Sequence, residues 1–151
     1  MESLEDLSQK LREITRDIVT DHPPLVDQVG ELVAKLTSAT GIPIYFDYRV
    51  SSLLNRQQIL DCYLVIQETL NNALKHGAAT EIFIRIYEEH HCLNFACRDN
   101  GEGFDYKTAI SQNTGMGLSN IAWRMRRLKG KYIVDSHPGS GSAFHYQISL
   151  G

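Results

Sequence analysis

The spacing of apolar residues changes along this chain, and that change limits the folds it can adopt. Over residues 4–19, 25–36 and 57–76, apolar residues recur every three or four positions, as in amphipathic helices. Over residues 42–48 and at several places beyond residue 81, they alternate with other residues, as in strands with one buried face. Strict strand–helix–strand alternation is absent. The pattern predicts an α+β protein, a two-layer sandwich in which a mixed, mostly antiparallel sheet packs on helices.

The later elements are predicted from the same patterns. Alternating strands over 82–87 and 93–97 flank a polar hairpin tip at His90 and His91, where a metal site would need further ligands. Residues 99–117 have the composition of a loop. A helix begins at Leu118 and stops at Gly130, and two final strands, 132–136 and 143–150, are joined by a turn.

Composition narrows the class of protein. The 151 residues are 42% hydrophobic, enough for one sizeable core. Fifteen basic and eighteen acidic side chains give a net charge of −3, which argues against a nucleic-acid binder with a strongly basic surface. The sequence contains neither a membrane-length apolar run nor a secretory signal. Three cysteines without a C-x-x-C pair fit free thiols. We therefore expect a cytoplasmic domain without membrane contact.

A polar stripe runs along the predicted helix 57–76. Glu68, Asn72 and Lys75 stand at positions i, i+4 and i+7, so a carboxylate, an amide and an ammonium group point the same way. A solvated helix face is the ordinary interpretation of such a stripe. The adjacent pair Asn71-Asn72 favours a functional one, because asparagine is a poor helix former. Amide and carboxylate oxygens also suit magnesium.

Three glycine motifs follow the stripe. Asp99-x-Gly101-x-Gly103 comes where an apolar strand ends, an arrangement that suits either a flat ligand or a simple turn. The run 115–118, Gly-Met-Gly-Leu, comes directly before a helix, where free backbone N–H groups can bind phosphate. It lacks the third glycine of a dinucleotide fingerprint, and the chain has no Walker lysine motif. The turn 139–142, Gly-Ser-Gly-Ser, is informative only by its position.

Taken in order, these motifs resemble the ATP-binding catalytic domain of sensor histidine kinases. That domain has the Bergerat-type fold shared with type II topoisomerases, mismatch-repair ATPases and heat-shock chaperones. The stretches QETLNNALKHG, DNGEGF, GMGLSNIAWRMRRLKG and HPGSGSAFHYQISL look like its N, G1, G2 and G3 boxes, and the resemblance extends from about Ile42 to Leu150. The short segment between Phe104 and Gly115 resembles the subfamily related to nitrate sensors.

The resemblance also implies a division of the chain. Residues 1–21 look like the end of a dimerisation-region helix, and residues 22–151 look like the catalytic domain. The segment that carries the phosphorylated histidine in the family is missing, and His22 is no substitute because two prolines follow it. We therefore expect a histidine protein kinase that is incomplete without its phosphoacceptor domain, with a response regulator acting downstream.

The family's site residues carry over to this sequence one by one, with ATP and Mg²⁺ as the implied cofactors. Asp99 would accept a hydrogen bond from the adenine amino group, with Gly101 and Gly103 letting the backbone approach the base. Asn72 would ligate Mg²⁺, and Glu68 would position the attacking group or act as a base. The remaining implied ATP-binding residues are Lys75, His76, Phe104, Gly115, Met116, Gly117, Leu118 and Ser142, the last at the far edge of the nucleotide.

Other interpretations stay open from the sequence. An anti-sigma-type serine kinase, a conformational ATPase of the topoisomerase or chaperone class and a nucleotide-binding module without transfer activity could share the fold. The basic residues Arg124, Arg126, Arg127 and Lys129 are expected to form a solvated helix face, although Arg124 matches a family arginine that would reach phosphate or the docking domain. Trp123 is expected to pack.

Overall fold

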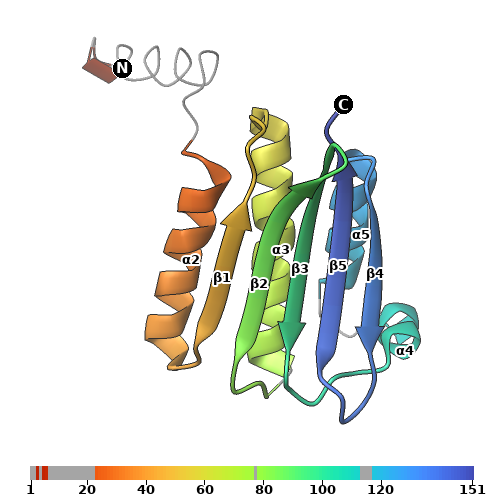
Figure 1. Ribbon diagram of the computed structural model, residues 1–151. Coiled ribbons are helices and arrows are strands. Elements are labelled where there is room, and N and C mark those ends of the chain that lie inside the picture. Colours follow the sequence, from red (N-terminus) through yellow and green to blue (C-terminus); the bar gives the residue numbers. More distant parts are fainter. Residues whose placement is uncertain (1–2, 4, 7–22, 77, 113–116) are drawn as a thin grey trace.

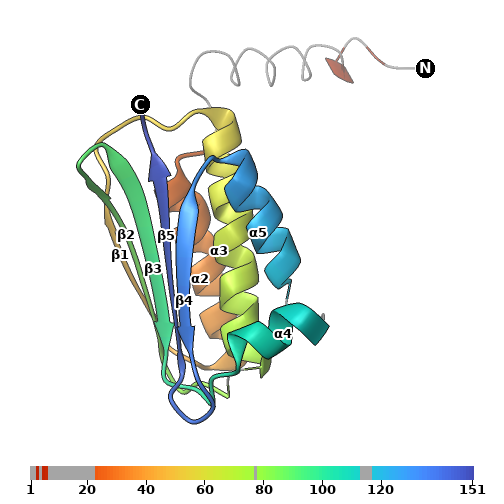
Figure 2. The same ribbon diagram turned by 90° about the vertical axis from the view of Figure 1, so that its right-hand side faces the viewer.

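The protein is a two-layer sandwich of one sheet and a set of helices. The computed structural model describes residues 3, 5–6, 23–76, 78–112 and 117–151. Within these ranges, three helices cover one face of the sheet, and the fourth lies beside its lower edge (Figures 1 and 2). The expected α+β sandwich is confirmed. The predicted helix over residues 4–19 lies almost entirely outside the described residues.

The strands pair in the order β1-β2-β3-β5-β4. Only β1 and β2 are parallel, and the other pairs are antiparallel, as the sequence predicts. The elements are α2 (Leu25–Thr40), β1 (Ile44–Arg49), α3 (Arg56–His76), β2 (Ile82–Glu89), β3 (Cys92–Asp99), α4 (Tyr106–Gln112), α5 (Leu118–Arg127), β4 (Lys131–Ser136) and β5 (Ser142–Ser149).

Local sequence signals fix the ends of the two long helices. Gly41 ends α2 in the left-handed conformation, with φ of 74°, and its N–H donates to the Thr37 carbonyl at 2.8 Å. At the start of α3, the Asn55 side chain accepts from the Gln58 N–H at 2.8 Å, and the Gln58 side chain accepts from the Asn55 N–H at 2.9 Å. This reciprocal capping box sets where α3 begins.

The core lies between the sheet and the helices. Alternate residues of each central strand point into it, as the period-two pattern requires. The face of α3 toward the sheet is equally apolar, and α2 packs beside it through its own buried stripe. The largest fully buried side chains include Leu25, Leu70, Ile82, Phe95, Ile121, Met125 and Tyr146.

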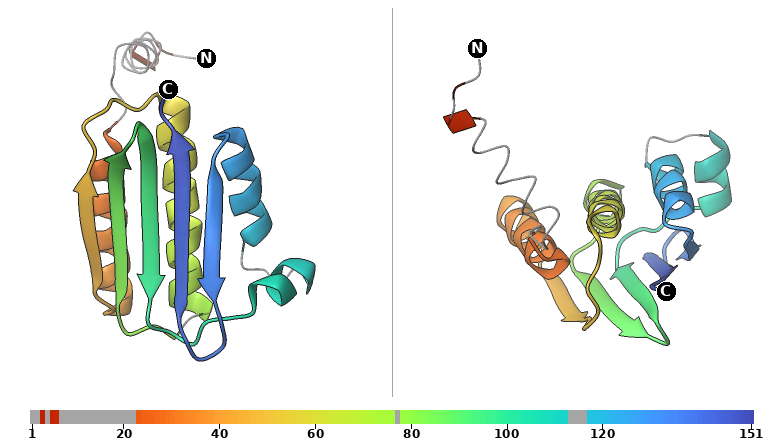
Figure 3. Two further views of the ribbon diagram at one scale, coloured as in Figure 1. Left: turned by 45° about the vertical axis from the view of Figure 1, so that its right-hand side comes forward. Right: turned by 90° about the horizontal axis from the view of Figure 1, so that it is seen from above.

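In the described part of the chain, no helix covers the opposite face of the sheet, as the side view and the view from above show (Figures 2 and 3). Aromatic and charged side chains alternate there. Tyr45 stacks on Phe83 at 5.0 Å between ring centroids, and the Arg98 guanidinium lies over the Phe83 ring. Stacking and cation–π contacts keep much of this apolar surface from water.

Two details differ from the sequence-based expectation. Residues 106–112 form the short helix α4 inside the segment predicted to be a loop, because only Ala109 of that helix is buried and a seven-residue helix shows too little periodicity. Leu60 is 48% exposed, although it is one of the apolar residues whose spacing predicts the helix over residues 57–76. Ile59 and Cys62, on either side of it, take the buried positions.

The described cysteines are free thiols. Cys62 and Cys97 are buried, and Cys92 is half-buried at the start of β3. Burial raises the pKa of both buried thiols to about 12, with nearby Asp61 and Asp99 respectively adding to the effect. Among the described helices, none is both long and apolar enough to cross a membrane.

One buried hydrogen bond joins the sheet to α3. The Thr69 hydroxyl donates to the Val65 carbonyl at 2.7 Å and lies 2.6 Å from the Tyr146 hydroxyl. We expect Tyr146→Phe to lower the free energy of unfolding by about 1 kcal/mol, because one buried hydrogen bond is lost while Thr69 keeps its own acceptor. Chemical denaturation measures this loss. The matched control is Tyr45→Phe, at a half-exposed position on the open sheet face, and an equal loss there would contradict the assignment.

Candidate functional site

Several segments that are distant in sequence meet at one end of the sandwich. The C-terminal end of α3, the end of β3 and the turn between β4 and β5 all lie at the lower end in Figure 1, and α4 lies beside that end (Figure 3). Helix α5 begins above α4, partway up the sandwich (Figure 3). These segments carry most of the residues that the sequence singled out. The motifs therefore converge in space.

Asp99 is the last residue of β3 and is 7% exposed. Its Oδ1 accepts a hydrogen bond from the Gly101 N–H at 2.9 Å. Burial raises the pKa of the Asp99 carboxyl above its usual range, and hydrogen bonds from the Gly101 and Ser142 backbone partly oppose that rise. The site thus holds a carboxylate whose charge is only partly compensated by the protein.

The turn after Asp99 is held rigidly. The Asn100 side-chain oxygen accepts from the Thr80 and Glu81 N–H groups at 2.9 and 3.1 Å, and its amide donates to the Thr80 hydroxyl. These bonds tie the end of β3 to the segment that enters β2. Asn100 therefore fixes the direction in which the neighbouring Asp99 points.

The two glycine loops interlock. A Cβ on Gly103 would overlap the His137 and Gly141 carbonyl oxygens, and one on Gly141 would overlap the Asp99 carbonyl oxygen. Both glycines also have positive φ values, 68° and 70°. The glycine at position 103 is therefore required by the protein's own backbone packing, beside the role that the family resemblance implies for it.

Ser136 joins the same two loops. Its hydroxyl accepts from the Phe104 N–H at 2.9 Å and lies 2.8 Å from the Ser142 hydroxyl. The Phe104 ring is half-buried and packs toward Phe144, at 6.2 Å between centroids. Ser142 pairs in register with Asp99. Ser142 therefore lies beside the residue expected to bind the base.

The polar stripe of α3 is unevenly buried. Asn72 is 5% exposed, Glu68 is half-buried and Lys75 is exposed. Among the described residues, the Asn72 side-chain nitrogen is the buried side-chain polar atom that has no hydrogen-bond partner. Buried polar groups almost always have partners, so an unpaired amide marks a position where a ligand is expected. Because Asn72 is buried and Glu68 is half-buried, this stripe is not simply a polar helix face in contact with solvent.

Gly117 brings the start of α5 against Glu68. A Cβ at Gly117 would overlap the Glu68 carboxylate, and its φ of 67° favours glycine independently. Leu118, the first residue of α5, is buried. Glycine therefore lets the helix begin this close to the Glu68 carboxylate without backbone strain and without displacing that side chain. The other predicted residues of this region, Gly115 and Met116, lie outside the described residues, as does the side chain of His76.

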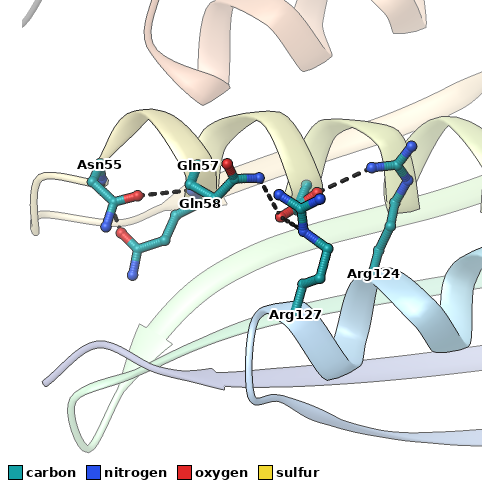
Figure 4. A network of polar contacts seen from close by, with 6 residues as sticks. Asn55, Gln57, Gln58, Arg124 and Arg127 are labelled. Atoms are coloured by element: carbon teal, nitrogen blue, oxygen red, sulfur yellow. Dashed lines mark hydrogen bonds and ion pairs between the residues drawn. The ribbon is translucent and has the colours of Figure 1, made fainter.

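Sequence reasoning missed Asp61, which is completely buried in α3. Its Oδ1 accepts from Arg124 Nη1 at 3.0 Å, and its Oδ2 lies 2.7 Å from Gln57 Nε2 and 3.5 Å from Arg127 Nε (Figure 4). An acidic residue among apolar neighbours, seven positions before Glu68, was the signal in the sequence that marked it.

This network corrects two expectations about α5. Arg124 and Arg127 do not belong to a solvated basic face, because both pair with the buried Asp61. Arg126 and Lys129 remain exposed. Trp123 is 46% exposed rather than packed, and the guanidinium groups of Arg124 and Arg127 lie over its ring. In this structure Arg124 thus contacts α3 through Asp61.

The described residues contain no group of three or more histidine, cysteine, aspartate or glutamate side chains arranged to hold a metal ion. His90 and His91 form the exposed turn between β2 and β3, both with positive φ.

Comparisons with known proteins agree with this geometry. Residues 57–151 match the family described as "Histidine kinase-, DNA gyrase B-, and HSP90-like ATPase". The sensor histidine kinases YdfH and ComP, both of Bacillus subtilis strain 168, are 28% and 31% identical over 127 residues, 83% of this chain. The chain spans only 31% and 16% of their respective lengths.

Solved structures show the same fold. The histidine kinase domain from the Erythrobacter litoralis EL346 blue-light activated histidine kinase has a TM-score of 0.71 at 18% identity, covering 84% of this chain and 61% of that one. The catalytic domain of histidine kinase ThkA has a TM-score of 0.66 at 17% identity, covering 83% and 90%. The chain belongs to the histidine kinase-, DNA gyrase B- and HSP90-like ATPase family, a family that binds ATP, and is the catalytic ATPase domain of a sensor histidine kinase.

Proposed function

We propose that this domain binds Mg²⁺-ATP at the lower end of the sandwich and transfers the γ-phosphoryl group to a histidine on a separate dimerisation domain of the same receptor. A response regulator then takes the phosphoryl group in the cytoplasm. The observation that carries the proposal is that β3, which ends at Asp99, and α3, whose last part carries Asn72, end at the same end of the fold (Figure 1), while Gly117 brings the start of α5 against Glu68.

The adenine end of the site is assigned to Asp99. A buried carboxylate that keeps an acceptor oxygen suits the exocyclic amino group of adenine, which is a hydrogen-bond donor. The hydrogen bonds of Asn100 hold the neighbouring turn, and the contact with the β4–β5 turn holds it from the other side. Preorganisation of this kind lowers the cost of binding because little reordering is needed.

The magnesium end is assigned to Asn72. Its unpaired buried nitrogen is a hydrogen-bond donor and would meet an acceptor such as a phosphate oxygen. Its amide oxygen would be free to ligate a hard cation. When bound, Mg²⁺ would neutralise charge on the phosphates. Gly117 and Leu118 would present backbone N–H groups at the positive end of the α5 dipole, with Gly115 and Met116 assigned to the same role.

Glu68 lies beside the phosphates in this arrangement and would orient the attacking histidine or accept its proton. Lys75 and His76 are assigned to the phosphate region as cationic groups. Phe104, which is also assigned to ATP binding, packs toward Phe144 and would support the base-binding loop from the core. Phosphoryl transfer depends chiefly on positioning and charge neutralisation, so the domain needs no nucleophile of its own.

The alternatives differ in what happens to the phosphoryl group. A serine kinase of the anti-sigma type would transfer it to a partner's serine, and a conformational ATPase would release it to water. The relatives described above, which match 83% of the chain, are named as sensor histidine kinases, and this favours transfer to histidine.

The deciding experiment is incubation of the domain with γ-labelled ATP and a purified dimerisation domain that carries the acceptor histidine. We expect label on the partner that is stable to base and lost in acid, as for phosphohistidine. Acid-stable label would favour the serine kinase. Phosphate release that is equal with and without the partner would favour the conformational ATPase.

Asp99→Asn tests the adenine end. The variant should bind ATP more weakly by about 1–3 kcal/mol, because a buried amide in place of the carboxylate leaves one hydrogen bond unmade, while affinity for free pyrophosphate stays the same. Calorimetric titration of both ligands measures the difference. Equal losses for the two ligands would show that Asp99 is structural.

The raised pKa of Asp99 gives a second, independent outcome. Because folding raises this pKa, the ionised carboxyl destabilises the fold above that pKa, and the cost is relieved as pH falls through it. Asp99→Asn should therefore unfold at a temperature no lower than the parent at pH 7, even though it binds ATP less well. A clear loss of stability in thermal melts would contradict this sign.

Asn72→Ala tests the magnesium end. The substitution should leave the fold intact, because the amide nitrogen has no partner to lose, and it should abolish the part of ATP affinity that depends on magnesium. The measurement is ATP titration with and without Mg²⁺, alongside thermal melts. The neighbouring, half-buried Asn71 supplies the control. If Asn71→Ala proves more damaging, or Asn72→Ala keeps its magnesium dependence, the assignment is wrong.

A further inference from the structure

The buried carboxylate of Asp61 joins α3 to α5. Asp61 is 0% exposed, and its two oxygens face Arg124 and Arg127 from α5 and Gln57 from its own helix (Figure 4). A buried carboxylate is costly unless charge-assisted hydrogen bonds satisfy it. The pairing therefore strongly favours one relative placement of the two helices, because any slide or rotation of α5 would leave this charge without partners.

The other end of α5 meets α3 in the proposed nucleotide site. Gly117 lies against the Glu68 carboxylate, which a Cβ at this position would have to displace. Glu68 is seven residues after Asp61 on α3, and Gly117 is seven residues before Arg124 on α5. Each separation is two helical turns, about 10 Å. The two helices run antiparallel, so the spacing from Asp61 to Glu68 on α3 equals the spacing from Arg124 back to Gly117 on α5. The ion pair at one end would therefore help to set the distance between Gly117 and Glu68 at the other.

We propose that Asp61 is a positioning residue for phosphate binding: through Arg124 and Arg127 it holds the first turn of α5 where its N–H groups meet the ATP phosphates. This inference rests on the proposed function and deepens it. It also gives Arg124 and Arg127 the role of holding α5 in this position. Their guanidinium groups lie over the ring of Trp123. Apolar packing of the same helices lacks this directionality, so it fixes their rotation less sharply.

The test compares two ligands that differ only in phosphate. Adenosine needs the Asp99 end of the site, whereas ATP needs the start of α5 as well. Asp61→Asn should weaken ATP binding by roughly five- to thirtyfold, the range expected when phosphate loses a helix N-terminus, and leave adenosine affinity unchanged. A purely structural role for Asp61 would change both affinities together or neither.

The matched control is Arg126→Gln, which removes an exposed arginine from the same helix. It alters the charge of α5 as much as loss of Arg124 would, but it does not touch Asp61. We expect the ATP-to-adenosine affinity ratio to stay at the parent value. Trp123 is the chain's single tryptophan, so its emission should change in Asp61→Asn and stay constant in the control.

Asp61→Asn leaves two arginines facing a neutral group and could fail to fold. The second variant, Asp61→Leu with Arg124→Leu, replaces the pair by apolar side chains, an exchange that folded proteins often tolerate. We expect it to fold, with a lowered ATP-to-adenosine ratio. A parent-like ratio in the folded double variant would overturn the proposal. Failure of the parent itself to bind ATP would instead overturn the proposed function, so the two failures are distinguishable.

Discussion

Helix α3 packs against the inner face of the sheet and carries Glu68, Asn72 and Lys75 of the proposed site. The start of α5 lies against it at Glu68. The apolar side of α3 contributes Leu70 to the core, and the hydrogen bond between Thr69 and Tyr146 ties it to β5. The capping box at Asn55 sets where the helix starts. With start and packing face fixed, the direction of Asp61, Glu68 and Asn72 follows from helical geometry alone.

The second constraint is the contact between the loop after β3 and the β4–β5 turn. Gly103 and Gly141 allow backbone to lie against backbone, and Ser136 joins the two segments by hydrogen bonds. Larger residues would push the loops apart and move Asp99 with them. The glycines in these two motifs therefore allow two loops of the same chain to pack together. The proposed ligand contact of Asp99 depends on that packing.

Much of the fold could be predicted from residue spacing. Helix and strand periods gave α2, α3 and all five strands within a few residues, because each of these elements buries one continuous face. Helix α4 was missed because seven residues with only Ala109 buried leave almost no periodic signal. The exposure of Leu60 was missed because helical spacing does not reveal which flank of a wide apolar face reaches the sheet.

The site was predicted less completely, for a different reason. Motif order indicated Asp99, Asn72 and Gly117, since each carries its own local signal. The pairing of Arg124 with Asp61, 63 residues earlier in the sequence, depends on how two helices meet, and no local pattern records that. The same holds for Gly103, whose close neighbours His137 and Gly141 belong to another loop.

The chemistry of the cysteines offers a practical consequence. With pKa values raised to about 12, Cys62 and Cys97 carry almost no thiolate at neutral pH, and burial also shields them from reagents. Alkylating dyes and spin labels should therefore select Cys92. That residue begins β3 and Asp99 ends it, so the label would sit roughly 23 Å along the strand from the proposed base-binding carboxylate. The wild-type chain thus already carries a single attachment point for distance measurements to a labelled nucleotide, without engineering.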